Sequence, residues 1–362
     1  MSLPVINIAP WLAQNTNVEA RKTTSEALHS ACLDYGFFYL DISEFVDPSV
    51  PEELTTLARK FFALPQGEKD KISLSNQDYA RGYQRLKENV TNGKADNHEG
   101  LDFYRPVENP DKSRPLWGEN QFPDAIPGFR EKYEAWVQKM KALGLIVMEA
   151  MAVGLGMTTD EWLELRSQVD DSFWVMRAIG SINASIPRDK LIFSAGYPPL
   201  PNDSDGFSCG AHKDYGCLTF LYADPTPSAL QVFLRQNGSI PVPDTSGLPA
   251  EQGAQQGIWI NADPIPGCVV CNIGEMFLSS SSRILMLVSN HWKLPNVYKA
   301  MMPSLRSRQW SMATFSWQKL ETTLQGARAS TVTDPDETFI QILNVTSTLV
   351  YLPRNYNMSL LK

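Results

Sequence analysis

The tripeptide His212-Lys213-Asp214 combines an imidazole and a carboxylate two residues apart, directly before an apolar run that indicates a β-strand. In an extended segment, residues i and i+2 point to the same face, so both side chains can reach one metal ion. Two histidines and one carboxylate on one octahedral face are the usual ligands of non-haem Fe(II). A third ligand must therefore come from elsewhere in the chain.

The candidates for that ligand are few, because the chain has only four histidines. His29 belongs to a predicted helix, and His98 belongs to the polar segment NGKADNHEG. By elimination, His291 is the best candidate for the third ligand. An exposed loop histidine is the alternative interpretation of the same residue.

The predicted secondary structure around these residues changes along the chain, from mixed helices and strands to mainly strands. The N-terminal part alternates short apolar strands with helices, and residues 127–155 predict a long amphipathic helix of the kind that backs a sheet. From about Phe173 onward, short β-rich runs alternate with Pro and Gly turns, a pattern typical of a sandwich or barrel such as a jelly roll. We predict an α+β fold in which a helical N-terminal region packs on a C-terminal jelly roll.

The composition and net charge favour a small molecule as the binding partner over nucleic acid or a membrane surface. The chain has 362 residues, 43% of them hydrophobic, and a formal net charge of −8, which disfavours nucleic-acid or anionic membrane surfaces. The five cysteines fit no paired zinc spacing and are interpreted as buried free thiols in a reducing compartment. Neither a secretory signal nor a run long enough to span a membrane is visible. We expect a cytoplasmic monomer that acts on a small molecule.

Motifs in a shared order over most of the chain resemble the isopenicillin N synthase-like branch of the Fe(II)/2-oxoglutarate-dependent dioxygenases. They include PVINIAP, YGFFYL, FFALPQGEK, GYQRL, DFYRP, GYPPL, HKDYGCLTFL, LQVFLRQNG and DPIPGCVVCNIGEM. The resemblance implies a double-stranded β-helix (jelly-roll) core that holds iron at one mouth. It also implies an N-terminal dioxygenase-type region over residues 1–125, followed by an oxygenase domain over residues 126–362 that includes the backing helix.

The resemblance implies Fe(II) as the metal, with 2-oxoglutarate and O2 as cosubstrates, and His212 and Asp214 match the first two ligands of the family. The distal ligand departs from the family pattern. If Asn290 is aligned with the Asn that precedes the family's distal strand, the ligand position holds Tyr298. If the count starts from Asn272, His291 falls within one residue of the usual spacing. Both positions stay open, although a phenol of pKa about 10 must be deprotonated by the metal itself.

The cosubstrate site also departs from the family. Aligning Ser311 with the serine of the family's Arg-x-Ser pair puts Gln309 at the arginine position, with Arg308 one residue away. Neighbouring strand residues face opposite sides, so Arg308 would need a bulge to reach the site. Tyr197 of GYPPL stands where the family often supplies a further cosubstrate contact, and it is equally plausible as a core aromatic.

The substrate is not encoded in these motifs. In the family, N-terminal elements grip the substrate over the iron, which here suggests Tyr83 and Arg85 of GYQRL with Phe103 and Tyr104 of DFYRP. The alternative is that these four residues pack the domain junction. Segment 181–196 interrupts a family motif, and segment 277–289 replaces or lengthens the connection before the distal strand. We hypothesise that both are additions to the family frame, either retained introns or gene-model errors.

Three functions follow from the sequence. The first is a 2-oxoglutarate-dependent oxidoreductase that hydroxylates or otherwise oxidises a small metabolite, in secondary metabolism. The second is an isopenicillin N synthase-like oxidase that needs no 2-oxoglutarate, which the missing arginine favours. The third is a catalytically impaired jelly-roll protein with an incomplete metal triad.

Overall fold

The computed structural model describes residues 2–12, 17–91, 94–169, 173–180, 209, 211–214, 216–225, 228–235, 257–274 and 339–346. The helices in these ranges are α1 (Ala9–Leu12), α2 (Val18–Asp34), α3 (Ser49–Phe62), α4 (Gln66–Asp70), α5 (Phe129–Gly154) and α6 (Thr159–Val169), with a 3-10 turn at Leu74–Asn76. The strands are β1 (Val5–Asn7), β2 (Phe37–Asp41), β3 (Gly82–Gln84), β4 (Val90–Thr91), β5 (Lys94–Ala95), β6 (Glu99–Tyr104), β7 (Phe173–Gly180), β8 (Leu218–Ala223), β9 (Gln231–Arg235), β10 (Gly257–Asn261), β11 (Cys268–Ile273) and β12 (Phe339–Thr346). The fold is therefore mixed α+β.

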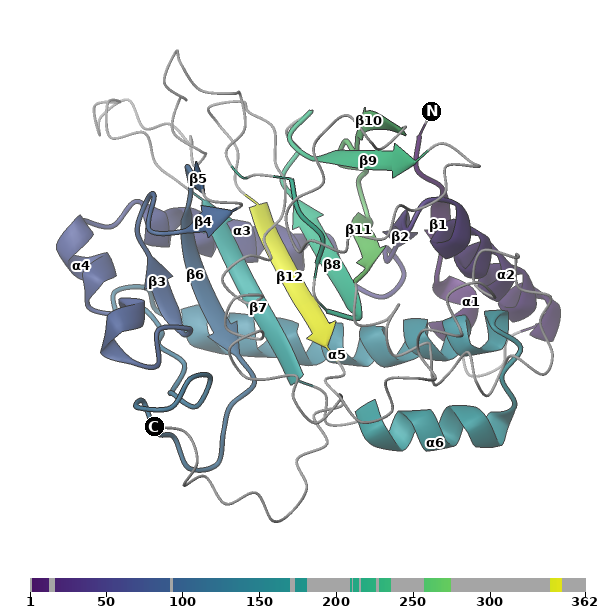
Figure 1. The fold of residues 1–362 in the computed structure, drawn as a ribbon, viewed down its shortest axis with the longest axis horizontal. Helices are drawn as coiled ribbons and strands as arrows, with labels where there is room; N and C mark the ends of the chain where they lie inside the picture. Colours follow the sequence, from purple (N-terminus) through teal and green to yellow (C-terminus); the bar gives the residue numbers. More distant parts are fainter. Residues whose placement is uncertain are drawn as a thin grey trace, which may run out of the picture.

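One eight-stranded sheet forms the centre of the molecule, in the order β1-β2-β11-β8-β12-β7-β6-β3 (Figure 1). Among the strand pairings that the structure describes in this sheet, β1 with β2 is parallel and the others are antiparallel. The N-terminal region supplies two strands at each edge, and the later part of the chain supplies the four strands between them. The two predicted regions thus share one continuous sheet.

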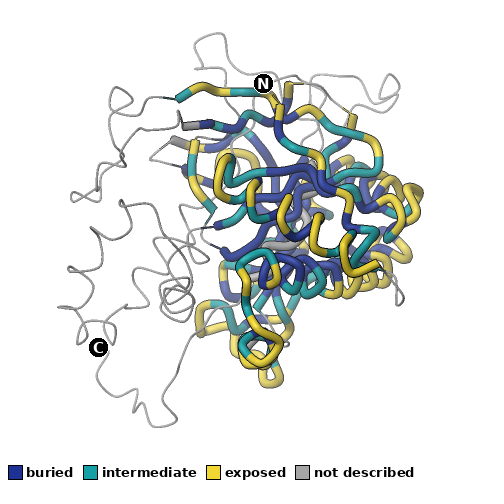
Figure 2. Tube along the Cα trace, turned by 90° about the vertical axis from the view of Figure 1, so that its right-hand side faces the viewer, coloured by how far each residue is buried: buried dark blue, intermediate teal, exposed yellow. Residues whose placement is uncertain are grey.

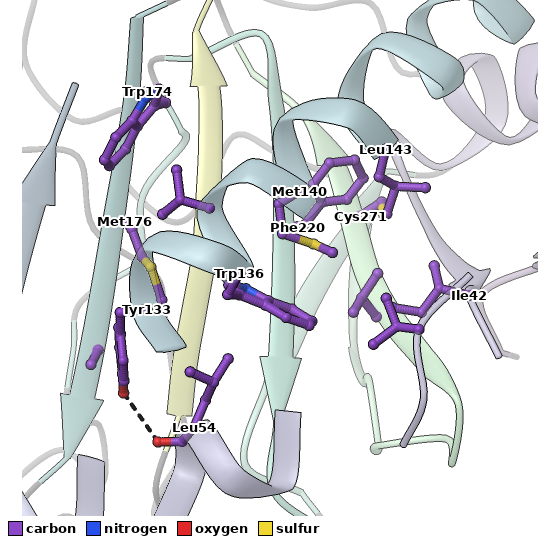
Figure 3. Close-up of a cluster of buried hydrophobic side chains, with 14 of the residues drawn as sticks. Ile42, Leu54, Tyr133, Trp136, Met140, Leu143, Trp174, Met176, Phe220 and Cys271 are labelled. Carbon is purple, nitrogen blue, oxygen red and sulfur yellow. Dashed lines mark hydrogen bonds between the residues drawn. The ribbon is translucent and has the colours of Figure 1, made fainter. Parts of the chain in front are cut away.

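Helix α5 covers one face of this sheet (Figure 1). Trp136 and Met140 of α5 are almost fully buried and belong to the same core cluster as Phe220 of β8 and Met176 of β7 (Figure 3). The Tyr133 hydroxyl donates a hydrogen bond to the Leu54 carbonyl oxygen at 3.1 Å, which ties α5 to α3. The prediction of a long backing helix is confirmed, with bounds of Phe129–Gly154 instead of residues 127–155.

The strands alternate between two faces, as the pleat requires. In β7, Met176 and Ala178 lie in the core beneath α5, whereas Ile179, next to Ala178, belongs to a second cluster on the opposite face. That second cluster includes Leu221 and Val270 of the sheet together with Val232 of β9. The two-stranded β9–β10 sheet therefore packs on the face opposite α5. In Figure 2, the buried parts of the described trace lie mainly inside and the exposed parts mainly at its outer surface.

The cysteines in the structure are free thiols, and Cys209, Cys217 and Cys271 are buried. Burial raises the pKa of Cys32 to about 12, so its thiolate is scarce at neutral pH. These thiols act as small core residues. Within the described residues, no helix is both long and apolar enough to cross a bilayer.

Candidate metal centre

His212 and Asp214 lie in the short segment of residues 211–214 that precedes β8. Their side chains approach each other, with His212 Nε2 at 3.5 Å from Asp214 Oδ1. The side chains are only 6% and 12% exposed, respectively. The two side chains therefore approach each other before β8 begins, and their role as metal ligands stays a prediction.

The second oxygen of Asp214 is held by the sheet. Thr219 Oγ1 of β8 donates to Asp214 Oδ2 at 2.7 Å, and Asn272 Nδ2 of β11 donates to the same oxygen at 2.8 Å. Thr219 and Asn272 are direct partners in the β8–β11 register. The strand neighbours of Thr219 and Asn272 face α5, so the side chains of Thr219 and Asn272 point to the opposite face. Their hydrogen bonds hold the Asp214 carboxylate on that face.

This donor set fits a divalent transition metal. Two adjacent ligands of an octahedral ion at about 2.1 Å each are about 3 Å apart, close to the observed separation of Nε2 and Oδ1. Within the described ranges, no group of three potential ligand residues is found. The predicted third ligand His291 and its alternative Tyr298 lie outside these ranges, as do Tyr197, Arg308, Gln309 and Ser311.

The first two predicted substrate residues, Tyr83 and Arg85, make their observed contacts with residues of the N-terminal region. Tyr83 is fully buried on the α5 face, where its hydroxyl donates to Glu99, which also pairs with Lys69 Nζ at 2.6 Å. Burial and the neighbouring Glu99 carboxylate raise the pKa of Tyr83. Arg85 is exposed and pairs with Asp70, with Arg85 Nε at 2.9 Å from Asp70 Oδ1, and this contact raises the pKa of Arg85. Full burial favours a structural role for Tyr83, whereas the role of the exposed Arg85 in substrate binding stays a prediction.

The other two predicted substrate residues, Phe103 and Tyr104, are neighbours at the end of β6 and face opposite sides of the sheet. The Phe103 ring stacks on Phe122 with 4.8 Å between ring centroids, on the α5 side of β6. The Tyr104 ring lies 5.1 Å from the Arg81 guanidinium carbon and is 7% exposed. The Tyr104 ring also lies 5.9 Å from the ring of Phe173 in β7, a contact between residues 1–125 and the oxygenase domain. A role of Phe103 and Tyr104 in substrate binding stays a prediction.

Two buried polar residues next to the predicted ones, Asp102 and Gln84, face the side of the sheet that carries Asp214. Asp102 of β6 is 1% exposed and accepts a hydrogen bond from Arg177 Nε at 2.6 Å, with a second contact from Arg177 Nη2 to its other oxygen. The two residues are register partners on β6 and β7. Gln84 of β3 is 6% exposed, and its Oε1 has no hydrogen-bond partner within the described residues. The alternation within GYQRL and DFYRP could have revealed both Gln84 and Asp102.

A buried polar cluster connects the N-terminal region to the segment that carries His212. Asp96 Oδ2 accepts hydrogen bonds from Asn89 Nδ2 at 2.8 Å and from Thr91 Oγ1 at 2.9 Å. Thr91 Oγ1 also lies 3.7 Å from the sulfur of Cys209, three residues before His212. The neighbouring His98 is only 1% exposed, so the polar segment NGKADNHEG contributes a core histidine and not a solvated one.

A cavity of about 520 Å³ lies on the α5 side of the sheet. Its walls include Trp174 and Met176 of β7 with Phe103 of β6, all of which point toward α5. His212 and Asp214 belong to the other face. The cavity is therefore separate from the candidate metal centre.

Comparisons with known proteins cover both halves of the chain. Residues 3–125 match the family described as the non-haem dioxygenase in morphine synthesis N-terminal region, and residues 187–317 match the 2OG-Fe(II) oxygenase superfamily. The chain is 35% identical over 283 residues to the homoarginine-6-hydroxylase 2-ODD-C23 of Glycine max, covering 76% of this chain and 76% of that protein. It is 35% identical over 291 residues to the homoarginine-6-hydroxylase 2-ODD-C23.1 of Arabidopsis thaliana, covering 78% and 77%, respectively.

A solved structure matches at the level of the fold. A full-length Neurospora crassa protein, crystallised in complex with alpha-KG and thymine, aligns with a TM-score of 0.60 at 18% identity, covering 95% of this chain and 85% of that chain. At this identity the match carries the mixed α+β architecture alone.

Proposed function

Since the chain belongs to the 2OG-Fe(II) oxygenase superfamily, an enzyme family of iron-dependent oxidoreductases, we propose that it hydroxylates a small organic metabolite with Fe(II), 2-oxoglutarate and O2. The observation that carries the proposal is the approach of His212 Nε2 to Asp214 Oδ1 inside the segment that matches the oxygenase family. The double-stranded β-helix predicted from the motifs is the core on which this centre would stand.

In this proposal, His212 Nε2 and Asp214 Oδ1 hold the metal, and His291 completes the triad, with Tyr298 as the alternative position. Iron in such a site supplies the activation of O2 that is coupled to decarboxylation of the 2-oxo acid. One oxygen atom enters a C–H bond of the substrate and the other enters succinate, with release of CO2. Ser311, Gln309, Arg308 and Tyr197 remain the proposed cosubstrate contacts.

We propose a basic amino acid or a related guanidino compound as the substrate class. Both relatives described above are named homoarginine-6-hydroxylases, and the similarity extends over three quarters of their length. The formal net charge of −8 also favours the approach of a cation over that of an anion. The role in secondary metabolism that the motifs suggest stays part of this proposal.

The proposal is tested by measuring succinate from 2-oxoglutarate with L-homoarginine, in the presence and absence of added Fe(II). We expect iron-dependent succinate formation that falls more than about 100-fold in Asp214→Ala, because loss of a ligand costs more than loss of its outer partners. Asp160→Ala, an exposed carboxylate on α6, is the control and should keep the parent rate. Succinate formation that is unchanged in Asp214→Ala would contradict the assigned centre.

The same assay separates the other two functions. Oxygen consumption that is indifferent to 2-oxoglutarate would support the oxidase, and the absence of Fe(II) binding would support the impaired protein. His291→Ala should abolish succinate formation if His291 is the third ligand. Tighter iron binding by Tyr298→His than by the parent chain would assign the third ligand position to residue 298 instead.

A further inference from the structure

Two hydrogen bonds converge on a single oxygen of Asp214. Thr219 Oγ1 and Asn272 Nδ2 both donate to Oδ2, at 2.7 and 2.8 Å, while Oδ1 is the oxygen that faces His212 Nε2 at 3.5 Å. The donors come from two neighbouring strands, and Asn272 lies 58 residues from Asp214 in the sequence. The sheet therefore distinguishes two oxygens that are chemically equivalent in the free side chain.

The two donors are themselves firmly placed. Thr219 is 1% exposed and Asn272 is 7% exposed, so little water competes for either hydrogen bond. At the same end of β8 and β11, Gly274 N donates to the Cys217 carbonyl oxygen at 3.0 Å. A Cβ at Gly274 would lie 1.9 Å from the Gly216 carbonyl oxygen, so the two strand ends approach as closely as backbone permits.

We propose that Thr219 and Asn272 are positioning residues that make Asp214 bind the metal through Oδ1 alone. The inference rests on the proposed metal centre at His212 and Asp214. Bidentate binding by Asp214 would turn Oδ2 toward the metal and would break both hydrogen bonds in a site from which water is largely excluded.

The way in which Asp214 binds sets how many coordination positions of the metal stay open for cosubstrates. Three single-atom protein ligands leave three positions of an octahedron for a bidentate 2-oxo acid and O2, whereas a bidentate Asp214 would leave only two. The clamp formed by Thr219 and Asn272 thus keeps one coordination position open. Without the clamp, 2-oxoglutarate and O2 would compete for the remaining positions.

The inference is tested with Co(II) as an anaerobic probe, whose visible absorption reports affinity and coordination number without turnover. We expect Thr219→Val and Asn272→Ala each to weaken Co(II) binding about 10- to 100-fold and to change the band shape. Thr219→Ser retains the hydroxyl and should restore both the affinity and the parent spectrum. The matched control Thr56→Val alters an exposed helix residue and should leave both unchanged.

The second readout is binding of 2-oxoglutarate to the Co(II) protein, which should weaken in Thr219→Val by more than the loss of metal affinity explains. If Asn272→Ala fails to fold, Asn272→Leu, which has a similar size and no donor, replaces it and should weaken Co(II) binding to the same extent. Parent affinity and parent spectra in the Thr219 and Asn272 variants, with binding lost in Asp214→Ala, would overturn this inference alone. Unchanged Co(II) binding in Asp214→Ala would instead overturn the proposed centre and the inference together.

Discussion

At the scale of single residues, the face of the sheet that carries Asp214 also holds an ion pair. The Asp102 and Arg177 side chains are 1% and 11% exposed, and they meet through two parallel hydrogen bonds between register partners. Moving two charges into the interior is costly unless they neutralise each other and their hydrogen bonds are satisfied. The pair therefore constrains the junction of β6 and β7.

We predict that Asp102→Asn lowers the free energy of unfolding by about 3 kcal/mol, because the negative charge opposite the Arg177 guanidinium is lost while the guanidinium stays buried. Urea denaturation followed by tryptophan fluorescence measures the change. Glu134→Gln breaks the exposed pair with Arg130, whose atoms lie 2.9 Å apart, and should cost less than about 0.5 kcal/mol. If both variants lost an equally small free energy of unfolding, the buried pair would contribute no more to stability than the exposed pair.

At the scale of elements, two helices of the α5 layer pack at backbone contact. Helix α2 crosses the end of α5 at Gly154, where a Cβ would lie 2.4 Å from the Ser25 carbonyl oxygen and 3.2 Å from His29 Cβ. His29 accordingly belongs to a helix interface, and burial lowers its pKa. The close approach leaves no room for a side chain.

We predict that Gly154→Ala destabilises the protein by about 1–3 kcal/mol, because the new methyl group must displace the backbone of α2. The matched control is Gly67→Ala on α4, where a Cβ would meet nothing within 4 Å. This control should be neutral or stabilising by up to about 1 kcal/mol, since alanine restricts the unfolded chain. A thermal melt of each variant measures the difference, and a Gly154→Ala protein as stable as the parent would contradict the packing argument.

At the scale of the whole molecule, the predicted N-terminal region and oxygenase domain are joined by strand pairing. β2 lies beside β11, and β6 lies beside β7, so residues 1–125 cover both edges of the central strands. Arg59 of α3 also pairs with Asp224 at the end of β8, with Arg59 Nη2 at 2.8 Å from Asp224 Oδ2. Each region therefore supplies hydrogen-bond partners to strands of the other that would otherwise be sheet edges.

We therefore predict that the full chain unfolds in one transition and that residues 126–362 alone do not reach the native state. Removal of the N-terminal region would open two strand edges and expose the core beneath them. Coincident far-UV and near-UV circular dichroism melts test the first statement. A 126–362 fragment that retains the near-UV spectrum of the same region in the full chain would refute the second.

The sequence alone determined the features that depend on local spacing. The spacing of His212 and Asp214 predicted that the two side chains lie on one side of the chain, where they approach to 3.5 Å. Helix α5 follows from its helical apolar period. The family motifs, read in order, predicted the superfamily that the comparisons found.

Only the tertiary structure decided which face each remaining side chain occupies and which distant residues meet. Tyr83 turned toward α5 and left Gln84 on the side of Asp214, because the register of β3 with β6 sets the orientation of every residue in the strand. Asn272 reaches Asp214 across 58 residues only because β11 pairs with β8. Strand order and register are properties of the whole sheet, so no local pattern encodes them.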